Sequence, residues 1–225
     1  MANPCDAQHG SVNWLDFQPL NIQGKKMMDL LLTILLYAFL GGAIKYIDQA
    51  YDESSYSLRS AGTLAVMAGV SMGYLMARDS PFSTAFFAAM LISLVLARKI
   101  DNQAFALGTA LAVASLLAFY PSSTVSWTLV PLALFLVAGF VDEVADGLVD
   151  KYRIEGFLQL FMNYRPFSDF ALFGMMLAGM FPWAYLLPYF GFTLSYMFVE
   201  RCSEKEHSFT DGVSWIKHRV LRRAN

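Results

Sequence analysis

The sequence 102–141, NQAFALGTALAVASLLAFYPSSTVSWTLVPLALFLVAGFV, decides the fold class, because it contains no Asp, Glu, Lys or Arg. It is twice as long as the ~20 apolar residues that one helix needs to cross the hydrocarbon core of a bilayer. The turn-forming sequence YPSS at 120–123 divides the run near its middle. Two membrane-spanning helices, 103–120 and 124–141, are therefore predicted.

The same search for uncharged runs, applied to the rest of the chain, predicts five more spans. Pro182 divides the long run 170–199 into two short spans. The predicted spans are 27–46, 61–77, 82–98, 103–120, 124–141, 167–182 and 183–200. Because the runs are continuously apolar, the predicted fold is an all-α, polytopic transmembrane bundle of about seven spans over 27–200. A polar segment, 1–26, precedes the bundle, and a tail, 201–225, follows it.

The composition agrees with a membrane protein. Of the 225 residues, 56% are hydrophobic and only 15% are charged, whereas average globular chains have about 45–50% and about 25%. The 16 basic and 18 acidic residues nearly cancel. This balance argues against a soluble enzyme, a disordered chain and a basic nucleic-acid binder, so the bilayer is the expected partner and nucleic acid is not. The composition makes no prediction of the oligomeric state.

The basic residues predict the orientation of the bundle in a cytoplasmic (plasma) membrane. With seven spans, Lys25, Lys26 and Arg78 lie on one side and the other 13 basic residues on the opposite side. The positive-inside rule then places the N-terminus outside and the C-terminus in the cytoplasm. In the tail, the apolar residues of 208–225 fall on one helical face, which indicates an interfacial helix on an anionic leaflet. A solvated basic end is the alternative.

Short similarities between the predicted helices indicate a two-helix unit repeated in parallel. The segments AIKYID at 43–48 and LARKID at 96–101 both end an outward-to-inward span with Asp. The return spans share AGTLAVMA at 61–68 and LGTALAVA at 107–114. Chance similarity between apolar helices is the alternative explanation.

Two groups of acids follow predicted spans on the cytoplasmic side. One contains Asp48 and Asp52, and the other contains Asp142, Asp146 and Asp150. Spacings of four place these carboxylates on one helical face, where like charges repel. A bound cation removes this repulsion, and Mg²⁺ is commonly held by one or two carboxylates together with phosphate oxygens. The groups therefore indicate a Mg²⁺ site for a lipid-soluble diphosphate. Alternatively, such acids merely mark where helices leave the lipid.

Basic residues on the same side are candidates for contacts with the phosphate groups, since guanidinium groups bind phosphate oxygens in pairs. These candidates are Arg59, Lys151, Arg153 and Arg165, with Arg59 and Arg165 preferred.

The arrangement of the acids resembles the UbiA superfamily of intramembrane prenyltransferases. Asp48-Gln-Ala-Tyr-Asp52 is similar to the first aspartate-rich motif of that family, Leu58-Arg-Ser-Ala-Gly62 to the arginine segment after it, and Asp142-Glu-Val-Ala-Asp146 to the second motif. The resemblance covers about residues 30–200. It implies a Mg²⁺-dependent transferase in which Asp48, Asp52, Asp142, Asp146 and Asp150 hold the metal. Asp48, Asp52, Asp142 and Asp146 then serve catalysis on a prenyl diphosphate, and Arg59 and Arg165 hold its phosphates.

Two other classes of function remain open on the sequence. A cation-coupled transporter or channel could use the acids as a cytoplasmic vestibule. The third possibility is a non-catalytic membrane subunit of a larger complex, whose acidic loops and basic tail bind a partner protein.

Overall fold

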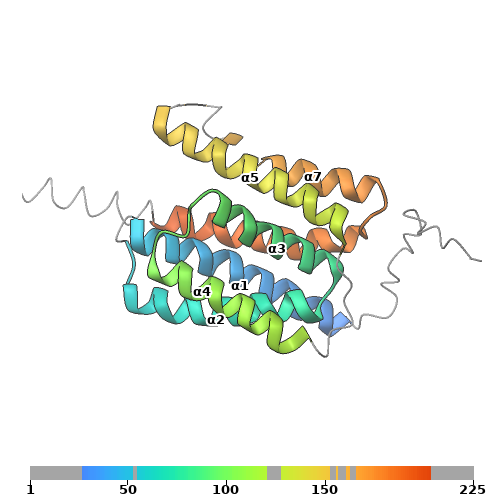
Figure 1. The fold of residues 1–225 in the computed structure, drawn as a ribbon, viewed down its shortest axis with the longest axis horizontal. Coiled ribbons are helices and arrows are strands. Elements are labelled where there is room, and N and C mark those ends of the chain that lie inside the picture. The colour runs from blue at the N-terminus through green and yellow to red at the C-terminus, as the bar shows by residue number, and fades with distance from the viewer. Residues whose placement is uncertain are drawn as a thin grey trace, which may run out of the picture.

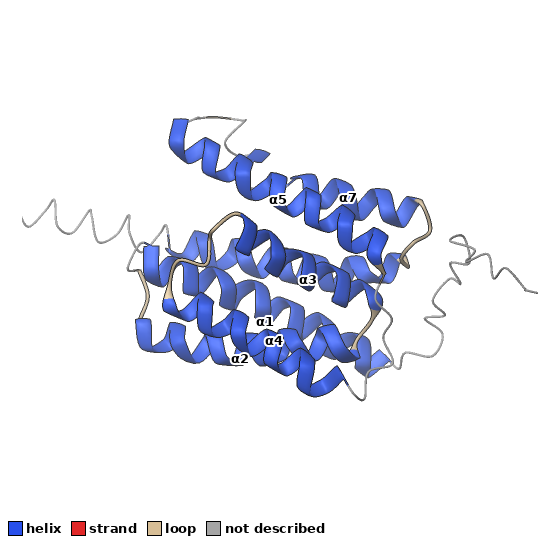
Figure 2. Ribbon diagram, viewed as in Figure 1, coloured by secondary structure: helices blue, strands red, loops and turns tan. Residues whose placement is uncertain are grey.

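The fold is known here from a computed structural model, which describes residues 27–52, 55–120, 128–152, 156, 161–162 and 166–203. These residues form helices and short connections, and none of them belongs to a β-strand (Figures 1 and 2). The all-α prediction is thus confirmed for the described part of the chain. The segments 1–26 and 204–225, with the predicted interfacial helix, lie outside it.

Each predicted apolar run coincides with a described helix. The helices are α1 (Met27–Asp52), α2 (Leu58–Arg78), α3 (Pro81–Leu96), α4 (Gln103–Phe119), α5 (Leu129–Tyr152), α7 (Pro166–Leu177), the 3-10 turn η3 (Trp183–Tyr185) and a last helix over 186–203. In Figure 1 their axes run nearly side by side. Helices α1, α3, α5 and 186–203 run in one direction, and α2, α4 and α7 run in the other.

This alternation gives the bundle two ends. The Asp48 end contains the last turns of α1 and of the 186–203 helix, the start of α2 and the α3–α4 connection at 97–102 (Figure 2). The Asp79 end contains the start of α1 and the α2–α3 turn. Since the chain reverses between α7 and the 186–203 helix, the region around Pro182 is a hairpin, as predicted, and not a kink.

In three helices, α1, α5 and α7, a predicted boundary is wrong by a turn or more. Helix α1 continues from residue 46 to Asp52, and α5 continues from 141 to Tyr152. Hydropathy detects only where apolar residues stop, whereas a helix continues through charged residues until a breaker interrupts it. Conversely, α7 ends at Leu177 and not at Pro182, because Gly179 adopts a φ of 73° directly after it. Glycine in this left-handed conformation is a common helix stop.

Small residues bring α2 and α4 into backbone contact. In the α2 sequence Gly69-Val-Ser-Met-Gly73, the two glycines face Gly108 and Ala112 of α4. A methyl group added to Gly73 would stand 2.5 Å from the Ala112 carbonyl oxygen. Two small residues four apart are the characteristic packing motif of membrane helices, because they allow backbones to approach. Gly69, Gly73 and Gly108 therefore serve close packing of α2 on α4.

Three other glycines within the predicted spans have open space around them. Nothing lies within 4 Å of a methyl group added to Gly62, Gly174 or Gly179. Among the described glycines, Gly41 of α1 makes the closest approach to another helix, since its backbone lies directly against the Phe192 carbonyl of the 186–203 helix.

Two pairs of helices pack together out of chain order. Helix α4 packs along α2, and α3 packs along α5, so the consecutive helices α3 and α4 do not pack closely on each other. Both pairs run in parallel (Figure 1). An aromatic core that includes Tyr37, Phe82 and Phe86 fills the space where α1, α3, α5 and 181–192 meet.

Large apolar side chains also cover the outside of the bundle. Leu117, Leu129, Leu177 and Phe198, on four different helices, are each more than 60% exposed. By length and composition, two described helices, Asp29–Asp52 and Leu58–Arg78, are able to cross a membrane, and α3, α4 and α7 are shorter apolar helices.

Candidate functional site

Asp48 takes part in a charge network that joins the first and last helices. The ammonium group of Lys45 lies 3.1 Å from the Asp48 carboxylate and 3.0 Å from the Glu200 carboxylate. It also lies 5.1 Å from the ring centre of Tyr196. Lys45 is only 7% exposed, so the two carboxylates and the aromatic ring replace the water that its charge loses.

Further contacts around this network fasten the end of α1 to the 186–203 helix. Ser203 donates to the Gln49 side chain at 2.6 Å and approaches the Ser55 hydroxyl at 3.0 Å. The rings of Tyr46 and Tyr56 stack with their centres 4.3 Å apart. Asp52, the last residue of α1, is exposed.

The Lys45 network makes a prediction about stability. We expect Lys45→Met to destabilise the protein by about 2 kcal/mol, below the 3–5 kcal/mol typical of breaking a buried ion pair, because the stranded carboxylates are each about one-third exposed. Heat denaturation in detergent, followed by size-exclusion chromatography, measures the change. Adding Glu200→Met should restore part of the loss, and Lys151→Met, at an exposed lysine, is the control. Equal stability of Lys45→Met and the wild type would contradict the network.

Asp142, the first acid of the second group, caps a helix. It is 1% exposed, and its Oδ1 accepts a hydrogen bond from the Phe167 amide at 3.0 Å. Its Oδ2 accepts from the Ser168 amide at 2.8 Å and from the Ser168 hydroxyl at 2.6 Å. These amides belong to the first turn of α7, where backbone N–H groups lack helical partners and the helix dipole favours a negative charge. Both oxygens of Asp142 thus bind α7.

The neighbouring acids also contact other helices. Glu143, 3% exposed, lies 2.8 Å from the Lys99 ammonium group and so joins α5 to the α3–α4 connection. Asp169 of α7 accepts a hydrogen bond at 2.5 Å from Tyr189 of the 186–203 helix.

The remaining predicted site residues are described less completely. Asp146 and Asp150 lie on α5, but their side chains are outside the described part, as are Arg153 and Arg165. Arg59 is exposed in the first turn of α2, and Lys151 is exposed with its ammonium 5.5 Å from the Tyr152 ring centre. Among the described residues, no three His, Cys, Asp or Glu side chains form a group able to hold a metal ion. The structure therefore does not gather Asp48, Asp52 and Asp142 into one described cluster.

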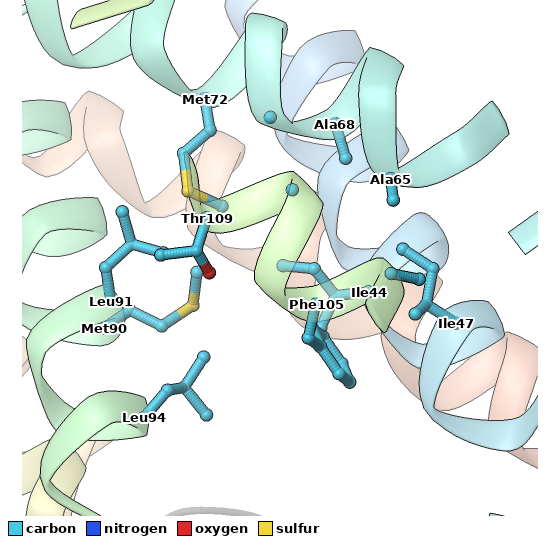
Figure 3. Close-up of a pocket in the computed structure, with 13 residues that line it drawn as sticks. Ile44, Ile47, Ala65, Ala68, Met72, Met90, Leu91, Leu94, Phe105 and Thr109 are labelled. Carbon is cyan, nitrogen blue, oxygen red and sulfur yellow. The ribbon is translucent and has the colours of Figure 1, made fainter. Parts of the chain in front are cut away.

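An apolar pocket lies between the first four helices, towards the Asp48 end (Figure 3). Its cavity volume is about 30 Å³, which rises to about 390 Å³ only when the open space at its mouth is included. The pocket occurs where α3 departs from α4 to pack on α5. Its walls include Ile44 and Ile47 of α1, Met72 of α2, Leu94 of α3 and Phe105 of α4, and Thr109 contributes a hydroxyl group. Asp48 follows one helical turn after Ile44, on nearly the same face of α1. Because the walls are apolar apart from that hydroxyl, a group inserted from the open side would have to be apolar.

Comparisons with known proteins do not identify a family for this chain. No protein-family model, curated protein or solved structure matches the chain. The resemblance to the UbiA superfamily therefore rests on the acidic and arginine motifs alone.

A second polar cluster, at the Asp79 end, was missed by the sequence analysis. The Asp79 carboxylate accepts hydrogen bonds from Thr33 at 2.8 Å, from Ser80 at 2.8 Å and from Ser83 at 2.5 Å. The Tyr37 hydroxyl, fully buried, lies 2.6 Å from the Ser83 hydroxyl. The cluster fastens α1 to the α2–α3 turn. The missed signal was a hydroxyl at each of positions 33 and 37, one turn apart within an apolar run.

Proposed function

We propose that the chain is a polytopic membrane protein that binds a lipid-soluble diphosphate, such as a prenyl diphosphate, and transfers its chain in a Mg²⁺-dependent reaction. The observation that carries the proposal is the apolar pocket beside Asp48. Ile44 and Ile47 form part of its wall and Asp48 follows them, so a chain in the pocket would bring its headgroup towards a carboxylate.

Two further features support the membrane part of the proposal. In a bilayer, the exposed leucines and phenylalanines on several helices would contact the acyl chains of the lipid, which are apolar. The described basic residues Arg59, Arg98 and Arg201 lie at the Asp48 end, whereas Arg78 lies at the other end. By the positive-inside rule the Asp48 end faces the cytoplasm.

In this proposal Mg²⁺ would stabilise the charge of the departing diphosphate. Asp48 and Asp52 would provide its carboxylate ligands, with Asp146 and Asp150 as candidates from α5. Asp142 is the least suitable of the predicted ligands, because both of its oxygens already bind α7.

The test combines a pocket variant with a carboxylate variant. We expect Thr109→Phe, which fills the pocket, to weaken binding of a prenyl diphosphate in detergent about tenfold. Its exposed neighbour offers the matched control Ala110→Phe, which should bind as the wild type does. Asp48→Asn should abolish the Mg²⁺-dependent part of binding and turnover. Normal binding by Thr109→Phe would overturn the assignment of the pocket.

A second candidate is a non-catalytic membrane subunit that binds a lipid chain without reacting with it. This function is favoured by the pairing of Asp48 with Lys45 and by the capping role of Asp142, which occupy two of the proposed metal ligands. Binding that is the same with Mg²⁺ and with a chelator, together with no turnover, would select this candidate.

A further inference from the structure

Arg98 adopts a backbone conformation that arginine rarely adopts. Its φ is 56°, and it is the one described non-glycine residue with a positive φ. It follows α3, where the Arg98 amide donates to the Val95 carbonyl at 3.1 Å and the Lys99 amide donates to the Leu94 carbonyl at 3.0 Å. This is the hydrogen-bond pattern of a glycine-type helix stop.

Helix α7 provides an internal comparison for this turn. It ends with the same two hydrogen bonds, from Gly179 to Met176 at 3.0 Å and from Met180 to Met175 at 2.9 Å. There the left-handed position holds Gly179, whose φ is 73°. Glycine has no Cβ and adopts this conformation at little cost, whereas an L-residue with a side chain is disfavoured. The chain therefore tolerates a backbone cost at Arg98 that it avoids at Gly179.

The contacts of the Arg98 side chain do not explain this cost. The side chain is exposed, and among the described residues its guanidinium has no hydrogen-bond or ion-pair partner. Two other polar residues of the connection serve the fold, since Lys99 pairs with Glu143 and Asn102 caps α4 by accepting from the Phe105 amide at 2.9 Å. Lys99 already supplies a positive charge for topology.

The position of Arg98 indicates what its charge could bind. The connection 97–102 joins Leu94 of α3 to Phe105 of α4, and both of these side chains line the apolar pocket. Arg98 thus lies at the end of the pocket where the headgroup of a bound chain would emerge. A guanidinium binds phosphate oxygens through two parallel hydrogen bonds.

We infer that Arg98 binds the phosphate of the lipid whose chain occupies the α1–α4 pocket. This inference rests on the proposed function, and it adds a phosphate-binding residue beside Arg59 and Arg165. The left-handed turn directs the chain from α3 into the connection, and the arginine is retained there because its ligand compensates for the backbone cost.

The test uses Arg98→Gly, for which binding and stability should change in opposite directions. Removing the guanidinium should weaken binding of a prenyl diphosphate about tenfold or more. Glycine should at the same time raise the melting temperature by about 2–4 °C. Arg98→Lys should recover part of the binding without the rise in melting temperature, and Arg201→Gln, which removes another exposed charge from the same end, should change neither.

The ligands and outcomes separate the two proposals. Binding is measured in uncharged detergent with Mg²⁺, using a prenyl diphosphate, the prenyl alcohol of equal length and inorganic diphosphate. Loss of prenyl diphosphate binding in Arg98→Gly, with alcohol binding unchanged, supports the inference. A comparable loss for inorganic diphosphate also supports a contact between Arg98 and phosphate, whereas an equal loss for the prenyl alcohol would assign Arg98 to the shape of the pocket and overturn the inference. Binding by the wild type with no loss in Arg98→Gly overturns the inference alone, and no binding by the wild type overturns the proposed function.

Discussion

Replacing Gly41 with alanine should separate the first and last helices and destabilise the protein by about 3 kcal/mol, at the upper end of the usual cost of overpacking. The added methyl group would collide with the Phe192 carbonyl and with the Ser195 hydroxyl group. Because the main obstacle is backbone, no change of side-chain rotamer relieves the collision. The fraction of monodisperse protein after heating in detergent measures the effect.

The adjacent glycine provides the control for this experiment. A methyl group added to Gly42 would meet its nearest neighbour, the Val199 side chain, at 3.6 Å, which is an ordinary contact. Since alanine is favoured over glycine in a helix by about 1 kcal/mol, Gly42→Ala should be neutral or stabilising. If Gly41→Ala matched Gly42→Ala in stability, the close approach of α1 to the 186–203 helix would be wrong.

Replacing Asp142 with alanine should destabilise the protein by about 2–3 kcal/mol, because hydrogen bonds to a charged group are worth about 1.5–3 kcal/mol and the Phe167 and Ser168 amides would lose their acceptor. Asp142→Asn keeps one acceptor oxygen and should cost about half as much. Ser168→Ala removes only the hydroxyl contact of 2.6 Å and should cost least. Thermal unfolding of the three variants gives the order.

This prediction distinguishes the two roles considered for Asp142. If Asp142 is a metal ligand, Asp142→Asn should abolish the Mg²⁺-dependent activity and leave the stability of the protein unchanged. If Asp142 instead caps α7, Asp142→Asn should reduce the stability of the protein. Asp101→Asn, at an exposed acid whose carboxylate accepts a hydrogen bond from the neighbouring Asn102 side chain at 3.4 Å, is a suitable control. Unchanged stability of Asp142→Asn would contradict the capping role.

The helices could be predicted because the signal is local. Uncharged runs of sufficient length identify α1 to α5, α7 and the 186–203 helix, and Pro182 correctly divides the last pair. The partners of each helix could not be predicted in this way. Helix α2 pairs with α4 through the helix faces that carry Gly69 and Gly108. Apolar runs of similar composition do not indicate which of their faces will meet.

The candidate site shows the same division between local and non-local information. The spacing of Asp142 and Asp146 correctly places both acids on one helix, but it does not reveal that α7 begins beside Asp142. Lys45, interpreted from the sequence only as a topological charge, instead bridges α1 and the 186–203 helix through Glu200. Asp142 lies 25 residues from Phe167, and Lys45 lies more than a hundred residues from Glu200, so both contacts become visible only in three dimensions.

Two of the four helices around the pocket, α3 and α4, are short, and so is α7; their length has a consequence for the surrounding lipid. At 1.5 Å per residue, α3 with 16 residues and α4 with 17 are about 24–26 Å long, and α7 with 12 residues is about 18 Å. The hydrocarbon core of an average bilayer is about 30 Å thick. Such hydrophobic mismatch is relieved by local thinning of the bilayer. In the proposed membrane topology, the headgroups of the two leaflets would therefore be drawn towards each other around α3 and α4, which would shorten the path from the cytoplasmic surface to the pocket.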